Sequence, residues 1–208
     1  MFLDHIMWGA SDLDAGIDEF ERLSGVRAAY GGPHPGNGTR NALCSLGPGV
    51  YFEIIAPDPE QPLTGTFGEA LARRAEPAVL ALAMRSTDLA GVDDVFKDAG
   101  IATERLSMSR DAPDGTVLNW DLLIPGARRD RKDPFTPFFI DWGNTRHPSE
   151  VTPSGCGFVG LEAAHPDAKR IGALWQRLGV PGSVRPADEP SLTVTLSSPK
   201  GEIVLNGG

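Results

Sequence analysis

The feature that most constrains the fold is a unit of one strand, one helix and three strands, which the hydrophobic pattern of the 208 residues indicates three times. In the first copy, an apolar strand at residues 2–8 precedes a helix at about residues 12–24, which has apolar residues at helical spacing and ends at Gly25. Strands near residues 27–30, 40–46 and 49–55 follow, separated by glycine- and proline-rich turns. The pattern predicts a βαβββ unit at residues 1–57.

The same order of elements returns twice. A connection at residues 58–77, which contains a short predicted helix, leads to a second βαβββ unit at residues 78–148. A third, βαβββ-like unit occupies residues 155–206. Agreement in helix length and in the closing glycines predicts an α+β protein built from repeated units, and a ferredoxin-like sandwich is the alternative architecture.

Charge and composition limit the partners of the chain. Its 28 acidic and 19 basic residues give a formal net charge of -9, which disfavours nucleic acid and anionic membranes as partners. The one basic run, at residues 128–132, is interpreted as a solvated loop. No apolar run approaches the roughly 18–20 residues that span a bilayer.

The first residues lack the charged and apolar regions of a signal peptide, and Cys44 and Cys156 are too few for a disulfide framework. We therefore expect a cytoplasmic protein, and the sequence leaves a homodimer open.

Short motifs run through all three units. The first unit carries Leu3-Asp4-His5, Asp12-Leu13, the polar segment 34–41 and Tyr51-Phe52-Glu53, the second carries Pro137-Phe138-Phe139-Ile140-Asp141-Trp142 and His147-Pro148, and the third carries His165-Pro166-Asp167 and Leu178-Gly179-Val180. In these motifs the chain resembles the glyoxalase-like domain family of the vicinal oxygen chelate superfamily.

The resemblance implies a cupped mixed sheet, formed where paired βαβββ units curl together. In that superfamily a divalent metal on the floor of the cup is held by side chains from the first and last strands of each unit, and it polarises vicinal oxygens of the substrate. Members include isomerising lyases, ring-cleaving dioxygenases, epoxide-opening thiol transferases and metal-free drug-binding proteins. The fold alone therefore does not select a reaction.

Two polar residues match the superfamily's ligand positions in the first unit. His5 and Glu53 each lie within an otherwise apolar strand, and an imidazole nitrogen with a carboxylate oxygen suits Zn²⁺, Mn²⁺, Fe²⁺ or Ni²⁺. When the second unit is aligned with the first, Ala81 takes the position equivalent to His5, and Asp141 takes the position equivalent to Glu53. We expect a metal set of His5, Glu53 and Asp141, with Glu53 or Asp141 acting as a base if no metal binds. A His5–Glu53 hydrogen bond without metal is the alternative.

Substrate contacts are expected from the polar segment 34–41 and from an aromatic wall. His34, Arg40 and Asn41 lie between two predicted strands and offer hydrogen bonds to a substrate, although such residues also satisfy the backbone of a hairpin turn. Trp120 is expected to wall the pocket, with core packing as the alternative. The third unit offers no ligand set and is interpreted as architectural.

The resemblance and these residues together imply a glyoxalase-like enzyme. The expected chemistry is a metal-assisted lyase or isomerase reaction on a small metabolite with vicinal oxygens. A metal-free protein of the same fold that binds and sequesters a small molecule is the alternative, and the missing second-unit histidine favours it.

Overall fold

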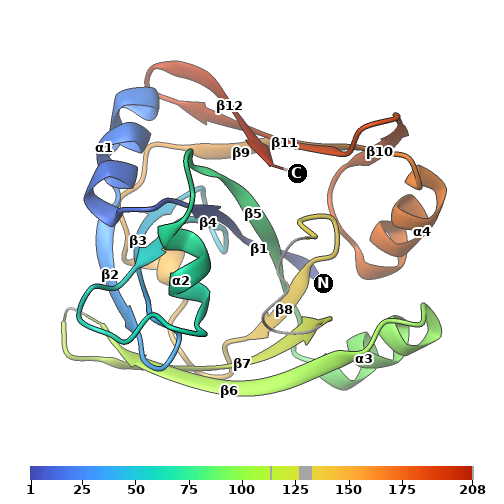
Figure 1. The fold of residues 1–208 in the computed structure, drawn as a ribbon, viewed down its shortest axis with the longest axis horizontal. Helices are drawn as coiled ribbons and strands as arrows, with labels where there is room; N and C mark the ends of the chain where they lie inside the picture. The colour runs from blue at the N-terminus through green and yellow to red at the C-terminus, as the bar shows by residue number, and fades with distance from the viewer. Residues whose placement is uncertain (113, 127–132, 208) are drawn as a thin grey trace.

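The computed structural model describes residues 1–112, 114–126 and 133–207, and the basic run at residues 128–132 lies outside them. The described chain contains three successive groups of one strand, one helix and three strands (Figure 1). The first group comprises β1 (Phe2–Gly9), α1 (Leu13–Ser24), β2 (Ala29–His34), β3 (Thr39–Ser45) and β4 (Tyr51–Pro57).

The remaining elements follow the same rhythm. After α2 (Phe67–Ala72), the second group comprises β5 (Ala78–Arg85), α3 (Leu89–Asp98), β6 (Thr103–Asp111), β7 (Val117–Pro125) and β8 (Phe138–Asp141). After a short 3-10 helix, η1 (Pro148–Glu150), the third comprises β9 (Gly157–His165), α4 (Ala168–Leu178), β10 (Ser183–Pro186), β11 (Ser191–Ser198) and β12 (Gly201–Gly207).

Local signals set the helix boundaries. The Asp12 side chain accepts a hydrogen bond from the backbone N–H of Ala15 at 2.9 Å, which caps the start of α1. Gly25 ends that helix with a φ of 78°, a left-handed conformation that glycine adopts without a steric penalty. The expected helix at residues 12–24 is thus found at Leu13–Ser24.

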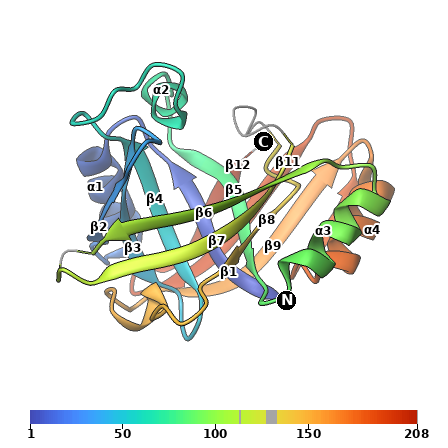
Figure 2. The ribbon, with the colours of Figure 1, turned by 90° about the horizontal axis from the view of Figure 1, so that it is seen from below.

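The first two groups share one eight-stranded sheet in the order β2-β3-β4-β1-β5-β8-β7-β6. In each group the first strand pairs in parallel with the last, β1 with β4 and β5 with β8, and antiparallel pairing of β1 with β5 joins the two halves. The sheet curls into a cup (Figure 2). The predicted cupped sheet of paired βαβββ units is therefore confirmed.

The two faces of this sheet bury different sets of side chains. Ile6, Phe52 and Phe139 belong to a core that also includes apolar residues of α1, α3 and α4. Met7 and Phe138, their neighbours along the strands, belong to a second cluster on the opposite face. This alternation follows from the period of two in a β-strand, and it leaves one face of the sheet for the cup.

The two ends of the curled sheet meet. A guanidinium N–H of Arg110 on β6 donates to the carbonyl oxygen of Gly31 on β2. Gly32 lies so close to β6 that a Cβ atom there would be 2.8 Å from the carbonyl oxygen of Asp111. The contact closes one side of the cup.

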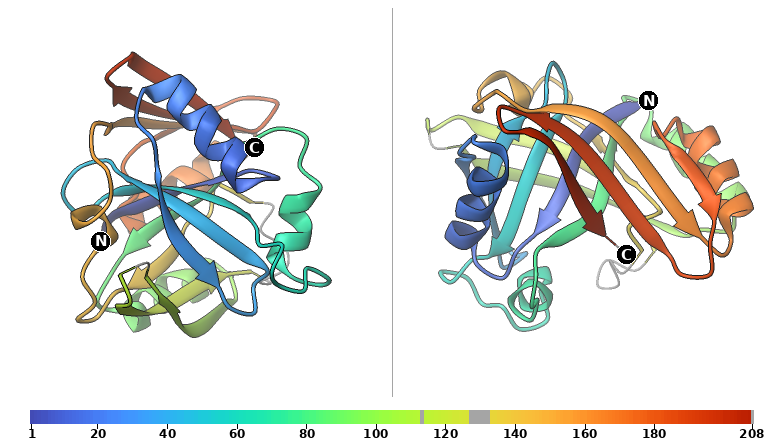
Figure 3. Two further views of the ribbon diagram at one scale, coloured as in Figure 1. Left: turned by 90° about the vertical axis from the view of Figure 1, so that its left-hand side faces the viewer. Right: turned by 90° about the horizontal axis from the view of Figure 1, so that it is seen from above.

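The third group has the expected element order but a different strand topology. Its sheet has the order β10-β9-β11-β12, so the first strand β9 is central and pairs in parallel with β10 rather than with the last strand. Val194 and Trp175 of this group join the helix-side core of the large sheet. Figure 3 shows the third sheet lying across the large sheet beside α1. The third group therefore covers the face opposite the cup.

No helix in the described part of the chain is long and apolar enough to cross a membrane.

Candidate active site in the cup

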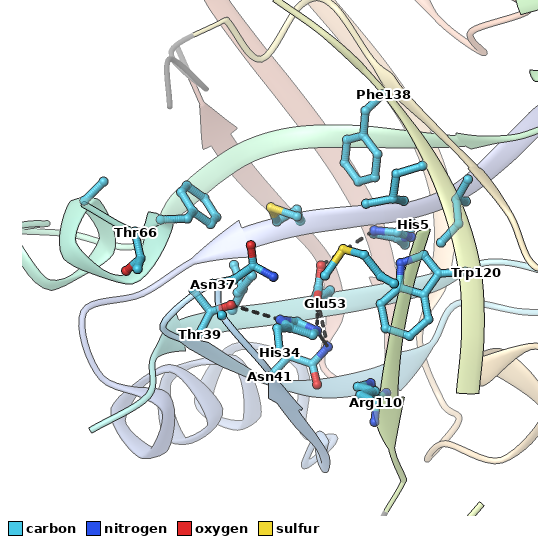
Figure 4. A pocket seen from close by; sticks show the side chains of 18 of the residues that line it. His5, His34, Asn37, Thr39, Asn41, Glu53, Thr66, Arg110, Trp120 and Phe138 are labelled. Atoms are coloured by element: carbon cyan, nitrogen blue, oxygen red, sulfur yellow. Dashed lines mark hydrogen bonds and ion pairs between the residues drawn. The ribbon is translucent and has the colours of Figure 1, made fainter. Parts of the chain in front are cut away.

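The cup encloses a cavity of about 630 Å³, a size that suits a small organic molecule (Figure 4). Its lining comes from β1, from the end of β2, from β3, β4, β6, β7 and β8 and from the segment around α2. Polar side chains from the first group face apolar and aromatic side chains from the second. The polar, charged and aromatic side chains of this lining include His5, His34, Asn41, Glu53, Arg110, Trp120, Phe138 and Trp142.

His5 and Glu53 are brought together on the floor of the cavity. Parallel pairing of β1 with β4 sets Met7 opposite Glu53 and Tyr51 opposite His5, so both polar side chains point into the cup. His5 Nε2 lies 3.6 Å from Glu53 Oε2, and both residues are only 4% exposed. The His5 ring stacks on Tyr51 with ring centroids 4.5 Å apart. A buried imidazole and carboxylate in this arrangement can exchange a proton with a molecule bound above them.

Asp4 holds His5 from behind. Its Oδ1 accepts from Nδ1 of His5 at 2.8 Å, which leaves Nε2 facing the cavity and Glu53. Its Oδ2 accepts from Nε2 of His147 at 3.0 Å and from Nε1 of Trp142 at 3.1 Å. Burial acts to raise the pKa of Asp4, but the hydrogen bonds from His147 and His5 outweigh it and lower the pKa to about 2.

His147 precedes a proline in a connection between elements, a pattern that predicts a turn or cap residue. It does cap η1, where Nδ1 accepts from the backbone N–H of Ser149. This acceptor role assigns the ring proton to Nε2, which donates to Asp4. His147 is linked to His5 through Asp4, which lies 143 positions earlier in the chain than His147. The sequence spacing gives no sign of this link.

Asn41 and His34 position the carboxylate of Glu53. The Asn41 amide Nδ2 donates to Glu53 Oε1 at 2.7 Å and lies 3.2 Å from His34 Nε2. His34 Nδ1 contacts the hydroxyl of Thr39 at 3.0 Å. His34 and Asn41 thus line the cavity, as the polar segment 34–41 predicted, whereas Arg40 points to the other side of β3 and does not line it.

The basic side chain in the cavity wall is instead Arg110, which the sequence analysis did not single out. Arg110 lines the cavity from β6 and is only 6% exposed. Burial lowers its pKa from the ordinary value, and negative charge on Tyr51 and Glu53 acts in the opposite direction. Glu104, Met108 and Arg110 alternate along β6 on the side that lines the cup, but nothing in the sequence marks Arg110 as buried.

Asp141 is not brought to the site. It lines a separate hollow on the other side of β8, and its Oδ1 accepts from the backbone N–H of Gly143 at 2.9 Å. Strand register explains the difference. Glu53 of β4 pairs with Met7 of β1. The residue of β5 equivalent to Met7 is Ala83, which pairs with Phe138 of β8, so Phe138 takes the position equivalent to Glu53. Trp120 does line the cavity, with its ring centroid 5.5 Å from that of Trp142.

The donor set does not fit a divalent metal held in the manner of the superfamily. The two second-unit positions are Ala81 and Phe138, which have no ligand atoms, and Asp141 lies outside the cup. Among the residues that the structure describes, no group of three or more histidine, cysteine, aspartate or glutamate side chains is arranged to hold a metal ion. The expected set of His5, Glu53 and Asp141 for Zn²⁺, Mn²⁺, Fe²⁺ or Ni²⁺ is therefore not assembled.

Paired βαβββ units around one cup define the vicinal oxygen chelate fold. The glyoxalase-like domain family matches residues 3–179 of the chain. The chain therefore belongs to the glyoxalase-like domain family. A search of curated protein sequences found no significant match.

A search of solved structures found matches at low sequence identity. A hypothetical protein from Staphylococcus aureus is 16% identical, with a TM-score of 0.67 over 98% of this chain and 84% of that chain. A variant of the Streptomyces coelicolor methylmalonyl-CoA epimerase, in complex with 2-nitronate-propionyl-CoA, is 18% identical, with a TM-score of 0.49 over 71% of this chain and 99% of that chain. The methylmalonyl-CoA epimerase from Mycobacterium tuberculosis is 20% identical, with a TM-score of 0.45 over 67% and 85% of the two chains.

Proposed function

We propose that the chain is a glyoxalase-type enzyme that moves a proton on a small substrate with vicinal oxygens, with Glu53 as the base. One observation carries the proposal: a buried carboxylate and a buried imidazole lie 3.6 Å apart on the floor of one cavity. Each has a partner that orients it, Asn41 for Glu53 and Asp4 for His5. Such orientation is what a proton-transfer pair requires.

In the proposed step, a C–H bond beside a substrate carbonyl breaks and its proton passes to the Glu53 carboxylate. The electron pair moves onto the carbonyl oxygen, which accepts a hydrogen bond from the protonated Nε2 of His5. Ionised Asp4 on the other ring nitrogen stabilises the positive imidazole. Return of the proton to a different position gives an isomerase, and loss of a neighbouring group gives a lyase. The step uses only side chains of the chain itself.

A metal-free binding protein of the same fold is the second candidate. The aromatic wall favours it, because Trp120, Trp142 and Phe138 offer an apolar surface against which a ring can pack. In that case the cup would hold its ligand without exchanging protons with it. The two candidates therefore differ in whether the chain catalyses exchange of carbon-bound hydrogen in its ligand.

The test follows exchange of carbon-bound hydrogen in deuterated water by proton NMR, with hydroxyacetone and 2-oxobutanoate as probes. We expect exchange above the buffer rate with the wild-type chain and a loss of at least about 100-fold in Glu53→Gln, because general-base catalysis typically contributes that much. Asp141→Asn is the matched control and should exchange like the wild type, since its carboxylate lies outside the cup. Equal exchange in wild type and Glu53→Gln would contradict the proposal, whereas saturable binding without exchange supports the binding protein.

A cytoplasmic location and the absence of nucleic-acid or membrane partners remain parts of the proposal, supported by the net charge of -9. Formation of a homodimer stays a prediction.

A further inference from the structure

Arg110 is a buried cation that faces the cavity without an anionic partner. Among the described residues, the cavity is lined by two arginines, Arg73 and Arg110. The side chain of Arg73 is 75% exposed and pairs with Glu69 at 2.6 Å. Arg110 is 6% exposed, and no carboxylate in the described part of the chain lies within 4.0 Å of its guanidinium.

The neighbours of Arg110 do not neutralise it. Its hydrogen bond to the carbonyl oxygen of Gly31 uses one of five guanidinium N–H donors and supplies no charge. Glu53, whose negative charge acts on Arg110, is engaged elsewhere, with Oε1 on Asn41 and Oε2 facing His5. A buried charge that lacks a partner is costly, so an arginine kept in a cavity wall indicates an anionic ligand in that cavity.

The other side chains of the cavity wall indicate which chemical groups the rest of that ligand carries. Trp120 and Trp142, with ring centroids 5.5 Å apart, and Met108 form an apolar surface on the second-group side. On the other side, Glu53 and His5 present the polar floor. The cavity thus combines a buried arginine, a proton-transfer pair and an apolar wall.

From this arrangement we infer that Arg110 binds the carboxylate of the substrate, and that the substrate is a small 2-oxo or 2-hydroxy carboxylic acid with an apolar body. In such an acid the carboxylate and the neighbouring oxygen are vicinal oxygens, so the inference rests on the proposed function and narrows its substrate class. Arg110 would take the carboxylate in its fork, the apolar body would pack on Trp120 and Trp142, and the 2-oxygen would face His5.

A monoanionic carboxylate fits this wall better than a phosphate. One guanidinium matches the two oxygens of a carboxylate in a bidentate pair. A phosphate dianion is usually bound by several donors at once, such as a helix N-terminus together with basic side chains. Among the described lining residues, Arg110 is the single buried arginine or lysine.

The experiment measures binding by isothermal titration calorimetry, which does not depend on turnover. Its probes are phenylglyoxylate, the matched neutral amide 2-oxo-2-phenylacetamide, and phenylphosphonate. We expect the wild-type chain to bind phenylglyoxylate at least about tenfold more tightly than the amide, since a charged hydrogen-bonded pair is worth that much or more. Arg110→Gln, which keeps a donor for the Gly31 carbonyl, should remove this preference while binding of the amide changes little.

Three further variants make the outcome decisive. Arg110→Lys keeps the positive charge and should retain part of the preference, which shows that a loss in Arg110→Gln does not come from misfolding. Arg40→Gln is the matched control, because Arg40 lies on β3 outside the cavity and should bind both probes like the wild type. Glu53→Gln removes a negative charge from the floor and should bind phenylglyoxylate at least as tightly as the wild type.

Binding that does not distinguish the acid from the amide, or that is unchanged in Arg110→Gln, overturns the inference. So does tighter binding of phenylphosphonate than of phenylglyoxylate, or no saturable binding of phenylglyoxylate up to about 10 mM. Loss of proton exchange is a separate readout: if Glu53→Gln exchanges normally while Arg110→Gln loses the preference for the acid, the proposed base is wrong and the carboxylate site stands.

Discussion

Asp4 carries a negative charge at a position that water does not reach. It is fully buried beneath the cup, where it accepts hydrogen bonds from His5, His147 and Trp142. These donors come from β1 and from the segment that follows β8, so one carboxylate ties the floor of the site to the end of the second group. Because it fixes which ring nitrogen of His5 faces the cavity, Asp4 is a positioning residue for the proposed proton transfer.

Replacement of this carboxylate should change how the stability of the chain depends on pH. In the folded protein the pKa of Asp4 is about 2, below its ordinary value of 3.8, so acid favours the unfolded chain, which binds the proton more tightly. The contribution, about 2 kcal/mol, should be fully present above pH 3.8 and lost as the pH falls to about 2. Urea unfolding of wild type and Asp4→Asn between these limits checks this.

The free energies of unfolding of wild type and Asp4→Asn should converge toward low pH. Asp14→Asn removes an exposed aspartate of α1 and controls for a general loss of negative charge. A constant gap between wild type and Asp4→Asn from pH 6 to pH 2 would contradict this account.

At the scale of elements, the meeting of β2 and β6 decides how closed the cup is. Gly32 has a φ of 133°, and a Cβ atom at this position would lie 2.8 Å from the carbonyl oxygen of Asp111. Since backbone atoms on a paired strand cannot move aside cheaply, the approach of the two sheet ends requires glycine here. The same contact places Arg110 against the cavity.

Gly32→Ala should therefore destabilise the chain more than a glycine substitution that meets open space. Gly47 is the matched control, because its φ of 120° is similar but no atom of the described residues lies within 4 Å of an added Cβ. Both variants incur backbone strain of about 1–3 kcal/mol, and we expect Gly32→Ala to lose about 1 kcal/mol more than Gly47→Ala. Chemical denaturation of the two variants measures the difference. Equal losses would mean that the sheet ends can separate without cost.

Elements with local signals were predictable, and those set by long-range pairing were not. The capping Asp12 and the closing Gly25 of α1 are local signals next to the helix ends, so the sequence indicated those ends correctly. The position of β9 at the centre of its own sheet depends on pairing with β10 and β11, which no local pattern encodes. The topology of the third group therefore became clear only from the structure.

The site shows the same division. His5 and Glu53 stood out because polar residues interrupt apolar strands, and the structure brings both to the cavity floor. Alignment of the two units by sequence made Asp141 the equivalent of Glu53. In the structure, the register of β8 gives that equivalent position to Phe138. Arg110 lies among polar residues of β6, where nothing local distinguishes a buried arginine from an exposed one.

At the scale of the whole molecule, the third group acts as a cover for the face of the sheet opposite the cup. Its sheet and α4 share one continuous core with α1, α3 and the large sheet (Figure 3). A shared core of this kind couples the parts of a chain into one cooperative unit. The cup is thus supported by residues that never touch its contents.

Two valines on neighbouring strands of the third sheet test this coupling. Val194 on β11 is fully buried in the shared core, while Val204 on β12 is 58% exposed. We expect Val194→Ala to lower the free energy of unfolding by about 2 kcal/mol, through lost apolar burial and a residual cavity, and Val204→Ala to change it by less than about 0.5 kcal/mol. In both variants urea transitions followed by circular dichroism and by tryptophan fluorescence should coincide, because the third group and the cup unfold together. Two separate transitions in Val194→Ala, with the fluorescence of the cup tryptophans unchanged in the first, would show instead that the third group folds and unfolds on its own.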